Sequence, residues 1–245
     1  MLRRFKIVIE YDGTNYFGWQ KQKKGETIQE LIERALLPLN GGRRGVRITG
    51  AGRTDAGVHA LGQVAHFDME TELDPGTIKI VINANTPKDI YVTRCEEVDK
   101  SFHARFSAKR RKYIYRIARR YSPFDRLFSW CPPYELDTEK LHKCSKLVVG
   151  KREFVRFCKS TCKAKSKECV VFESFWKEGE RFLEYHISAN RFLQSMVRML
   201  VGTMIEVARG RYTVEDFKNL LENKTNEVQV LTAPAKGLFL KEIIY

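Results

Sequence analysis

Residues 50–60 read Gly-Ala-Gly-Arg-Thr-Asp-Ala-Gly-Val-His-Ala and link two strand-like stretches, Val46 to Thr49 and Gln63 to Asp68. An aspartate in such a loop usually forms a turn by accepting hydrogen bonds from nearby backbone N–H groups. Glycines on both sides of Asp55 also allow a substrate to approach the backbone closely. The stretch therefore predicts either a plain turn or a catalytic centre at Asp55.

The first half of the chain has the order of elements found in ferredoxin-like domains. Residues 5–11 alternate apolar and polar side chains, which predicts a strand with one buried face. Thr27-Ile28-Gln29-Glu30 has the pattern of a capping box, and Asn40-Gly41-Gly42 is typical of a helix end. The expected elements are a strand at 5–11, a helix at 27–39, strands at 46–49 and 63–68, a helix at 74–84 and a strand at 90–98. RNA-recognition domains share this split βαβ order.

The second half repeats this order with one additional helix. Its expected elements are a strand at 112–119, a helix at 137–149, strands at 170–176 and 182–188, helices at 193–209 and 214–222, and a strand at 237–244. No Gly/Ser linker separates the halves, so we expect domains at 1–104 and 105–245. The predicted fold class is α+β: two ferredoxin-like or RRM-like halves sharing a continuous, mainly antiparallel sheet, with a catalytic cleft between them.

The 245 residues carry 44 lysines and arginines against 30 aspartates and glutamates, a formal charge of +14. This charge attracts polyanions and makes nucleic acid the first partner to consider, although a generally basic proteome produces the same balance. Between residues 105 and 121 cations are interleaved with aromatic rings, a pattern that suits RNA. The cations are Arg105, Lys109, Arg110, Arg111, Lys112, Arg116, Arg119 and Arg120, and the rings are Phe106, Tyr113, Tyr115 and Tyr121.

Neither membrane insertion nor metal binding is indicated by the sequence. No apolar run reaches the ~20 residues of a membrane span and the first residues contain no signal-peptide core, so we expect a cytoplasmic protein. The six cysteines are then expected to be free thiols. Cys158, Cys162 and Cys169 lie close in sequence, but they form no Cys-x-x-Cys pair and have no histidine at ligand spacing. We therefore expect no metal site.

Three further residues have both a structural and a chemical interpretation. His59 is either an acid/base partner of Asp55 or a loop histidine that bonds locally, and no Gly-x-Ser-x-Gly motif supplies a hydrolase nucleophile. Arg198 lies among apolar residues of the predicted 193–209 helix, so it either pairs with an anion or extends its stem to the surface. Tyr113 alternates onto one strand face with Tyr115, where it either packs in the core or stacks on a base.

The chain resembles the tRNA pseudouridine synthase A family along nearly its whole length. The matching motifs are Glu10-Tyr11-Asp12-Gly13, Gly18-Trp19-Gln20, Gly52-Arg53-Thr54-Asp55-Ala56-Gly57-Val58-His59, Asn83-Ala84-Asn85, Phe102-His103-Ala104-Arg105-Phe106-Ser107-Ala108, Tyr113-x-Tyr115, Met196-Val197-Arg198 and Thr232-Ala233-Pro234-Ala235-x-Gly237-Leu238. The resemblance implies a homodimeric enzyme that isomerises uridine to pseudouridine at positions 38, 39 and 40 in the anticodon arm of tRNA. Such an isomerisation requires no cofactor.

The resemblance also implies roles for individual residues. Asp55 corresponds to the catalytic aspartate that engages the nucleoside while the C1′–N1 bond breaks, either as nucleophile or as base. Arg198 corresponds to the arginine that pairs with it, and Tyr113 to a tyrosine against the uracil. Leu238 bounds the base, and Arg53 enters the RNA where the flipped nucleotide leaves. Further candidates for contacts with tRNA are Arg105, Arg110, Arg111, Lys112 and Arg191.

Two other functions remain open at this point. A non-catalytic RNA-binding protein with tandem RRM-like domains explains the charge and the tyrosines, but it gives no reason for Asp55 and Arg198 together. A hydrolase that uses Asp55 and His59 is compatible with the charge, but it lacks a nucleophile or a metal site.

Overall fold

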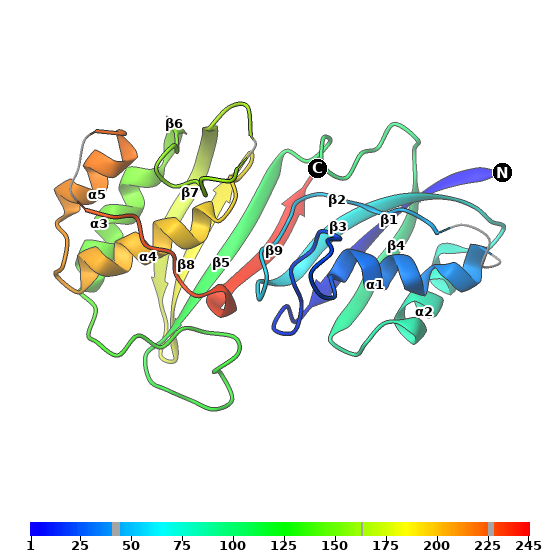
Figure 1. Cartoon of the computed structure of the whole chain (residues 1–245), viewed down its shortest axis with the longest axis horizontal. Coiled ribbons are helices and arrows are strands. Elements are labelled where there is room, and N and C mark those ends of the chain that lie inside the picture. The colour runs from blue at the N-terminus through cyan, green and yellow to red at the C-terminus, as the bar shows by residue number, and fades with distance from the viewer. Residues whose placement is uncertain (41–44, 163, 225–227) are drawn as a thin grey trace. The chain divides into compact units, whose positions relative to one another are not determined.

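The computed structural model describes residues 1–40, 45–162, 164–224 and 228–245 (Figure 1). Contacts divide the chain into two compact units: unit 1 comprises Met1–Lys109 and Leu240–Tyr245, and unit 2 comprises Arg110–Phe239. The division thus falls five residues after the expected 104/105 boundary (109 − 104), and the last six residues return to unit 1. Side-chain bonds explain the later division, since Ala104 N–H donates to His66 Nδ1 (3.2 Å) and the Tyr245 hydroxyl donates to the Ala104 carbonyl (2.8 Å).

Unit 1 has the predicted order of strands and helices. Its elements are β1 (Leu2–Tyr11), α1 (Ile28–Ala35), the 3-10 helix η1 (Leu37–Asn40), β2 (Thr49–Gly50), β3 (His59–Glu70), α2 (Pro75–Asn85) and β4 (Ile90–Val98). The strands lie in the order β4-β1-β3 with β2 on β3, and all of these pairs are antiparallel. This is the ferredoxin-like order, so the α+β assignment is confirmed for this half.

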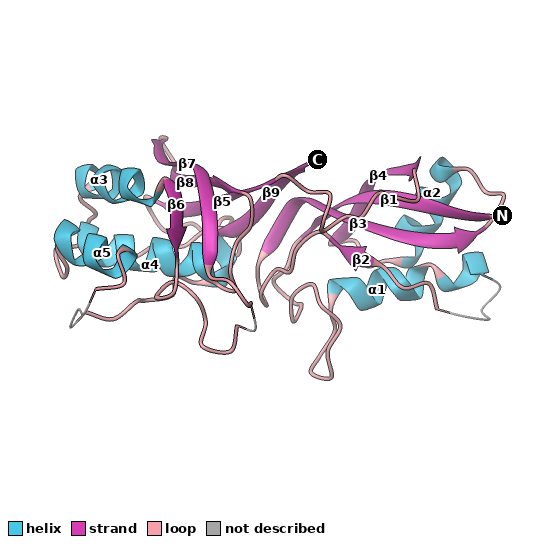
Figure 2. Ribbon diagram, turned by 90° about the horizontal axis from the view of Figure 1, so that it is seen from above, coloured by secondary structure: helices cyan, strands magenta, loops and turns pink. Residues whose placement is uncertain are grey.

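Alternation of side chains explains how the unit 1 sheet buries one face. Phe5, Ile7 and Ile9 of β1 are fully buried, whereas Lys6 and Val8 between them are only half-buried. The two helices of the unit pack against each other, and α2 also packs on β4 (Figure 2). The α2 helix begins where its sequence predicts, because the Asp74 side chain accepts the Thr77 N–H at 3.0 Å.

The predicted capping box at Thr27 is wrong. The Thr27 side chain makes no capping bond, although Thr27 is the N-cap residue of α1. The first amides of the helix instead donate to a loop, from Ile28 N to the Gly18 carbonyl (3.2 Å) and from Gln29 N to the Trp19 carbonyl (3.0 Å). The helix start is therefore satisfied by distant backbone, which a local sequence pattern does not reveal. Of the predicted helix end, Asn40 is the last residue of η1, and Gly41 and Gly42 lie outside the described residues.

The strand predicted at 46–49 is also shorter than expected. Only Thr49 and Gly50 pair with β3, opposite His66 and Ala65. Upstream of that pair, the Ile48 N–H donates to the Glu33 carboxylate at 3.1 Å. A side-chain acceptor therefore takes the backbone donor at this point, and the ladder extends no further.

Unit 2 contains β5 (Arg110–Ala118), α3 (Thr138–Val148), β6 (Gly150–Glu153), β7 (Glu168–Glu178), β8 (Phe182–Ala189), α4 (Met196–Ala208), α5 (Val214–Leu221), the 3-10 helix η2 (Ala235–Gly237) and the start of β9 (Leu238–Ile244). Its strands lie in the order β9-β5-β8-β7-β6, and β5, β8, β7 and β6 pair antiparallel. Without β6 this order again is ferredoxin-like. The sequence did not predict β6, because Gly-Lys-Arg-Glu has no apolar alternation and pairs only along the edge of the sheet.

The α4 helix of unit 2 lies very close to the chain that precedes η2. A Cβ built on Gly202 would lie 2.4 Å from the Leu231 carbonyl oxygen and 2.8 Å from the Ala233 nitrogen. Only a residue without a side chain fits between these backbones. None of the helices in the described part of the chain is long and apolar enough to cross a membrane.

Gly202→Ala is expected to destabilise the protein by about 1–3 kcal/mol, because the new methyl group must displace a backbone segment. A thermal unfolding scan measures the effect as a lowered Tm. The matched control is Gly52→Ala, where an added Cβ meets no atom within 4 Å. Equal melting temperatures for the two variants would contradict the packing described for Gly202.

Candidate functional site

The loop that carries Asp55 is fixed to the rest of unit 1 at both of its ends. At its start, Ala51 N–H donates to the Val64 carbonyl (2.8 Å), and the Gln63 side chain donates to the Gly52 carbonyl (2.9 Å). At its end, Gly57 N–H donates to the Tyr16 carbonyl at 3.2 Å. The loop contains a turn as well, closed by the 3.1 Å bond from Val58 N to the Asp55 carbonyl. Asp55 is thus both a turn residue and a half-buried carboxylate.

The residue before Asp55 is held from two sides. The Thr54 carbonyl accepts the Trp19 N–H at 3.2 Å, and the Thr54 hydroxyl lies 2.8 Å from the hydroxyl of buried Tyr11. Gly18 has a φ of 84°, and a Cβ there would lie 2.4 Å from the Thr54 carbonyl oxygen. The backbone at Asp55 therefore has little freedom to move, which suits a group that must meet a substrate in one geometry.

Arg53 extends from the same loop into solvent. Its Nε donates to the Gln20 Oε1 at 3.1 Å. Within the described residues its guanidinium has no carboxylate partner. The positive charge is therefore held in place by a neutral amide.

The geometry at His59 supports the local interpretation. The ring is 1% exposed, and its Nδ1 accepts the Gly13 N–H at 3.1 Å and lies 3.1 Å from an Asp12 carboxylate oxygen. A Cβ on Gly13 would lie 2.1 Å from the Val58 carbonyl oxygen, so this turn packs directly on the loop. His59 thus connects the first turn of the chain to the end of the Asp55 loop.

In unit 2, Arg198 is fixed against the segment before η2. Its Nε donates to the Ala233 carbonyl (2.8 Å), and its own carbonyl accepts the Ala233 N–H (3.0 Å). The side chain is half-buried and does not simply extend along the surface. Burial raises the pKa of Tyr115, and the positive charge of Arg198 opposes that rise.

The segment that holds Arg198 also contacts the tyrosine face of β5. The Tyr115 hydroxyl donates to the Pro234 carbonyl at 2.8 Å, and a Cβ on Gly237 would lie 2.7 Å from the Tyr115 ring. Leu238 follows directly and is buried. Tyr113, on the same face of β5, is also largely buried, and its ring meets that of Phe192 edge-on with centroids 5.1 Å apart. Unit 2 therefore arranges Tyr113, Arg198 and Leu238 around Tyr115 and residues 233–237.

The other basic candidates differ in their surroundings. The Arg110 guanidinium lies 4.4 Å from the Phe172 ring centroid, and Arg111 donates to the Asn190 carbonyl at 2.6 Å. Arg105 lies over the exposed ring of Phe106, Lys112 is half-buried on β5, and half-buried Arg191 lies close enough to Cys169 to affect its pKa. Two further cations of the basic stretch are paired, Arg116 with Glu184 (2.9 Å) and Arg119 with Glu178 (2.8 Å).

All six cysteines are free thiols. Burial raises the pKa of Cys169 to about 11. Burial acts in the same direction on Cys162, but hydrogen bonds from the Ala164 backbone and from Cys158 outweigh it and lower the pKa of Cys162 to about 7. Over the described ranges, no cluster of three or more histidine, cysteine, aspartate or glutamate side chains could hold a metal ion.

The sequence did not predict several residues that hold these candidates in place. Gln20, Gly18 and Tyr11 fix the Asp55 loop, and Phe192 and Ala233 fix the unit 2 candidates. Gly18 and Gln20 belong to a motif, Gly-Trp-Gln, that the sequence already singled out. Their partners lie more than thirty positions away, so the motif alone did not reveal them.

Comparisons with known proteins identify the family. A family model described as tRNA pseudouridine synthase matches residues 7–107 and 144–245. The tRNA pseudouridine synthase A of Lacticaseibacillus casei is 39% identical over 250 residues, covering 100% of both chains. That of Bacillus licheniformis is 38% identical over 244 residues and that of Ehrlichia ruminantium 40% identical over 246 residues, each covering 99% of both chains.

A solved structure of an unknown protein from Galdieria sulphuraria covers 84% of this chain and 92% of its own, at 10% identity. Its TM-score of 0.26 is too low to bear on the fold. The family match, in contrast, extends over both units, and the relatives match from end to end. The chain therefore belongs to the tRNA pseudouridine synthase family, whose members are isomerases that act on tRNA.

Proposed function

We propose that this protein converts uridine to pseudouridine at positions 38, 39 and 40 in the anticodon stem-loop of tRNA. The observation that carries the proposal is the fixed loop around Asp55, in a chain whose family is that of tRNA pseudouridine synthases. The protein acts as a homodimer in the cytoplasm. It needs no cofactor, because the reaction involves no net oxidation or reduction and the Asp55 carboxylate supplies the reactive group.

The chemistry begins at the Asp55 carboxylate. The carboxylate either attacks C1′ of the ribose or removes a proton from the sugar, and in both routes the C1′–N1 bond breaks. The uracil turns, and C5 bonds to C1′. In the first route this displaces the carboxylate from C1′, and in the second Asp55 returns the proton to the sugar. In both routes the C5 proton then leaves and N1 regains one. The rigid backbone at Thr54 and Gly57 supports this role, because a small displacement of the carboxylate would slow each step.

Residues of the second half of the chain complete the active site. Arg198 pairs with Asp55, since a guanidinium and a carboxylate attract each other and bond in a defined geometry. Tyr113 lies against the uracil and helps to remove the C5 proton, and Leu238 bounds the base. The bonds that fix Arg198 to Ala233 support this proposal, because a pre-positioned guanidinium loses little side-chain entropy when it meets an anion.

The target nucleotide must leave its stem to reach Asp55, which costs a few kcal/mol. Arg53 enters the RNA where that nucleotide leaves. Contacts with tRNA phosphates offset the cost, and the proposed residues are Arg105, Arg110, Arg111, Lys112 and Arg191.

Release of tritium from tRNA labelled at uridine C5 tests the function. We expect release without chain cleavage and without free uracil. A non-catalytic RNA-binding protein would release none, and a hydrolase would liberate base or fragments. Mapping of pseudouridine in the treated tRNA then shows whether positions 38–40 are the targets.

Asp55→Ala is expected to reduce tritium release to background while tRNA binding changes by less than about threefold, because the carboxylate acts on the sugar and not on phosphates. Asp99→Ala is the control, since that exposed carboxylate bonds nearby Ser101, whose N–H lies 2.8 Å away. Turnover by Asp55→Ala above background would contradict the catalytic role.

Arg198→Ala is expected to lower kcat by about 10²-fold, because the charge that pairs with Asp55 is lost. Arg198→Lys keeps the charge but not the Nε–H that donates to Ala233, and we expect an intermediate kcat. Single-turnover rates at saturating enzyme measure both. If all three proteins turn over equally fast, Arg198 has no part in the chemistry.

Binding of tRNA is expected to weaken steeply with salt, and Arg110→Ala should lower the slope of log Kd against log salt by about one phosphate contact. Arg119→Ala is the matched control on the same basic stretch, because its guanidinium is already paired with Glu178. Filter binding at several salt concentrations gives both slopes. Identical slopes for wild type and Arg110→Ala would place Arg110 away from the RNA.

A further inference from the structure

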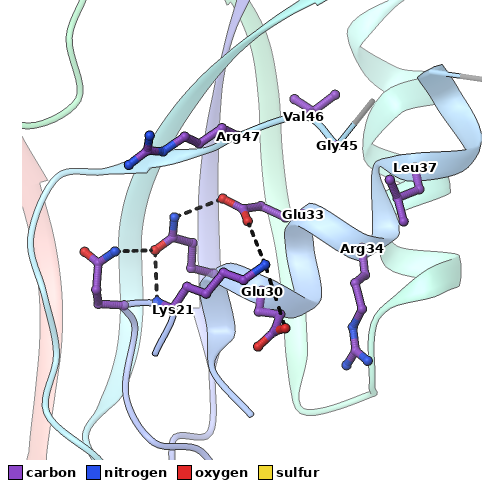
Figure 3. Close-up of a pocket in the computed structure, with 10 residues that line it drawn as sticks. Lys21, Glu30, Glu33, Arg34, Leu37, Gly45, Val46 and Arg47 are labelled. Carbon is purple, nitrogen blue, oxygen red and sulfur yellow. Dashed lines mark hydrogen bonds and ion pairs between the residues drawn. The ribbon is translucent and has the colours of Figure 1, made fainter. Parts of the chain in front are cut away.

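A line of side-chain amides connects Arg53 to the middle of α1. The Arg53 Nε donates to Gln20 Oε1 (3.1 Å), and Gln20 Nε2 donates to Gln29 Oε1 (3.0 Å). Gln29 Nε2 then donates to Glu33 Oε1 at 2.9 Å. The line forms part of one surface pocket, in which Glu33 faces the ammonium group of Lys21 and Arg47 lies on the opposite wall (Figure 3).

Backbone groups determine which way each amide points. Gln29 Oε1 also accepts the Lys21 N–H (3.1 Å), and Gln29 Nε2 also donates to the Ile48 carbonyl (3.2 Å). A backbone N–H only donates and a carbonyl only accepts, so Gln29 cannot flip without losing both bonds. Gln20 must then direct its nitrogen to Gln29 and its oxygen to Arg53.

The inner end of this line is rigid. Gln29 is 5% exposed and lies on α1, where its own N–H donates to the Trp19 carbonyl at 3.0 Å. Glu33 Oε1 accepts a second hydrogen bond, from the Ile48 N–H at 3.1 Å. Gln20 is therefore attached to the core of unit 1 through its side chain as well as through the adjacent Trp19.

At the outer end of this line, the charge of Arg53 remains available to bind an anion. An amide oxygen orients a guanidinium but does not neutralise it, whereas a carboxylate at position 20 would form an ion pair. The bond uses Nε and leaves both terminal nitrogens of Arg53 without a bond to Gln20. Such an arrangement suits an arginine that must keep one direction and still bind a polyanion.

We propose that Gln20 and Gln29 are positioning residues for Arg53, and that they direct its guanidinium into the tRNA during extrusion of the target nucleotide. The inference rests on the proposed function for the role of Arg53. This line of side chains, from Glu33 through Gln29 and Gln20 to Arg53, is called the relay. Because the relay acts on extrusion of the nucleotide and not on overall docking of the tRNA, its loss lowers kcat more than it raises KM.

A double-mutant cycle tests the relay, with pseudouridine formation measured for wild type, Gln20→Ala, Arg53→Ala and the double variant. We expect Gln20→Ala to lower kcat/KM by about tenfold, mainly through kcat, with an unchanged Tm. The double variant should be no slower than Arg53→Ala, because Gln20 acts only through Arg53. Gln22→Ala is the control, a glutamine of the same loop whose amide, among the described residues, bonds the Phe17 carbonyl alone (2.6 Å).

Activity of Gln20→Ala within about twofold of wild type, or effects of Gln20→Ala and Arg53→Ala that multiply, would overturn the proposal. A second measurement does not depend on catalysis. The Arg53 Nε–H resonance, assigned by its loss in Arg53→Ala, should exchange faster with solvent in Gln20→Ala than in wild type or Gln22→Ala. Equal exchange rates would refute the relay, whereas a lack of pseudouridine with wild-type protein would refute only the proposed function.

Discussion

The hydrogen bond from the Trp19 N–H to the Thr54 carbonyl, 3.2 Å long, ties together the parts of unit 1 that support Asp55. On its other side, the same segment accepts the first amides of α1 through the carbonyls of Gly18 and Trp19. A helix start leaves N–H groups that need partners, so α1 and this segment are fixed to each other. Because Gly18 leaves no room for a side chain beside Thr54, the Asp55 loop in turn follows the position of the segment.

In unit 2 a backbone segment likewise holds candidate residues in place, but it connects different elements. The segment at 231–237 crosses α4 at Gly202, bonds Arg198 through Ala233 and accepts the Tyr115 hydroxyl through Pro234. Backbone groups that would otherwise need water are thereby paired with a helix side chain and a strand side chain. The proposed roles of Arg198 and Leu238 depend on this crossing segment, whereas Tyr113 is held against Phe192.

The cations that give the chain its formal charge of +14 are not equally available to bind a polyanion. Arg116, Arg119 and Arg181 each lie within 3 Å of a carboxylate, on Glu184, Glu178 and Asp125 respectively. Such surface pairs add little stability, but they reduce the field that a polyanion meets. Arg53 is oriented by an amide and Arg110 by an aromatic ring, so both retain their full charge. The charge that each cation offers to a polyanion therefore depends on its neighbours as well as on its place in the sequence.

The sequence by itself determined the elements that depend on local order. The alternation at 5–11, the helix at 74–84 and the strand at 90–98 all follow from residues a few positions apart. The sequence motifs also identified Asp55 and Arg198 as candidate site residues. Only the tertiary structure decided what caps α1, where β2 ends, that β6 exists and how Gln20 meets Arg53. In each of these cases a group's partner lies far away in sequence, because backbone donors and acceptors bond whichever group folding brings opposite them.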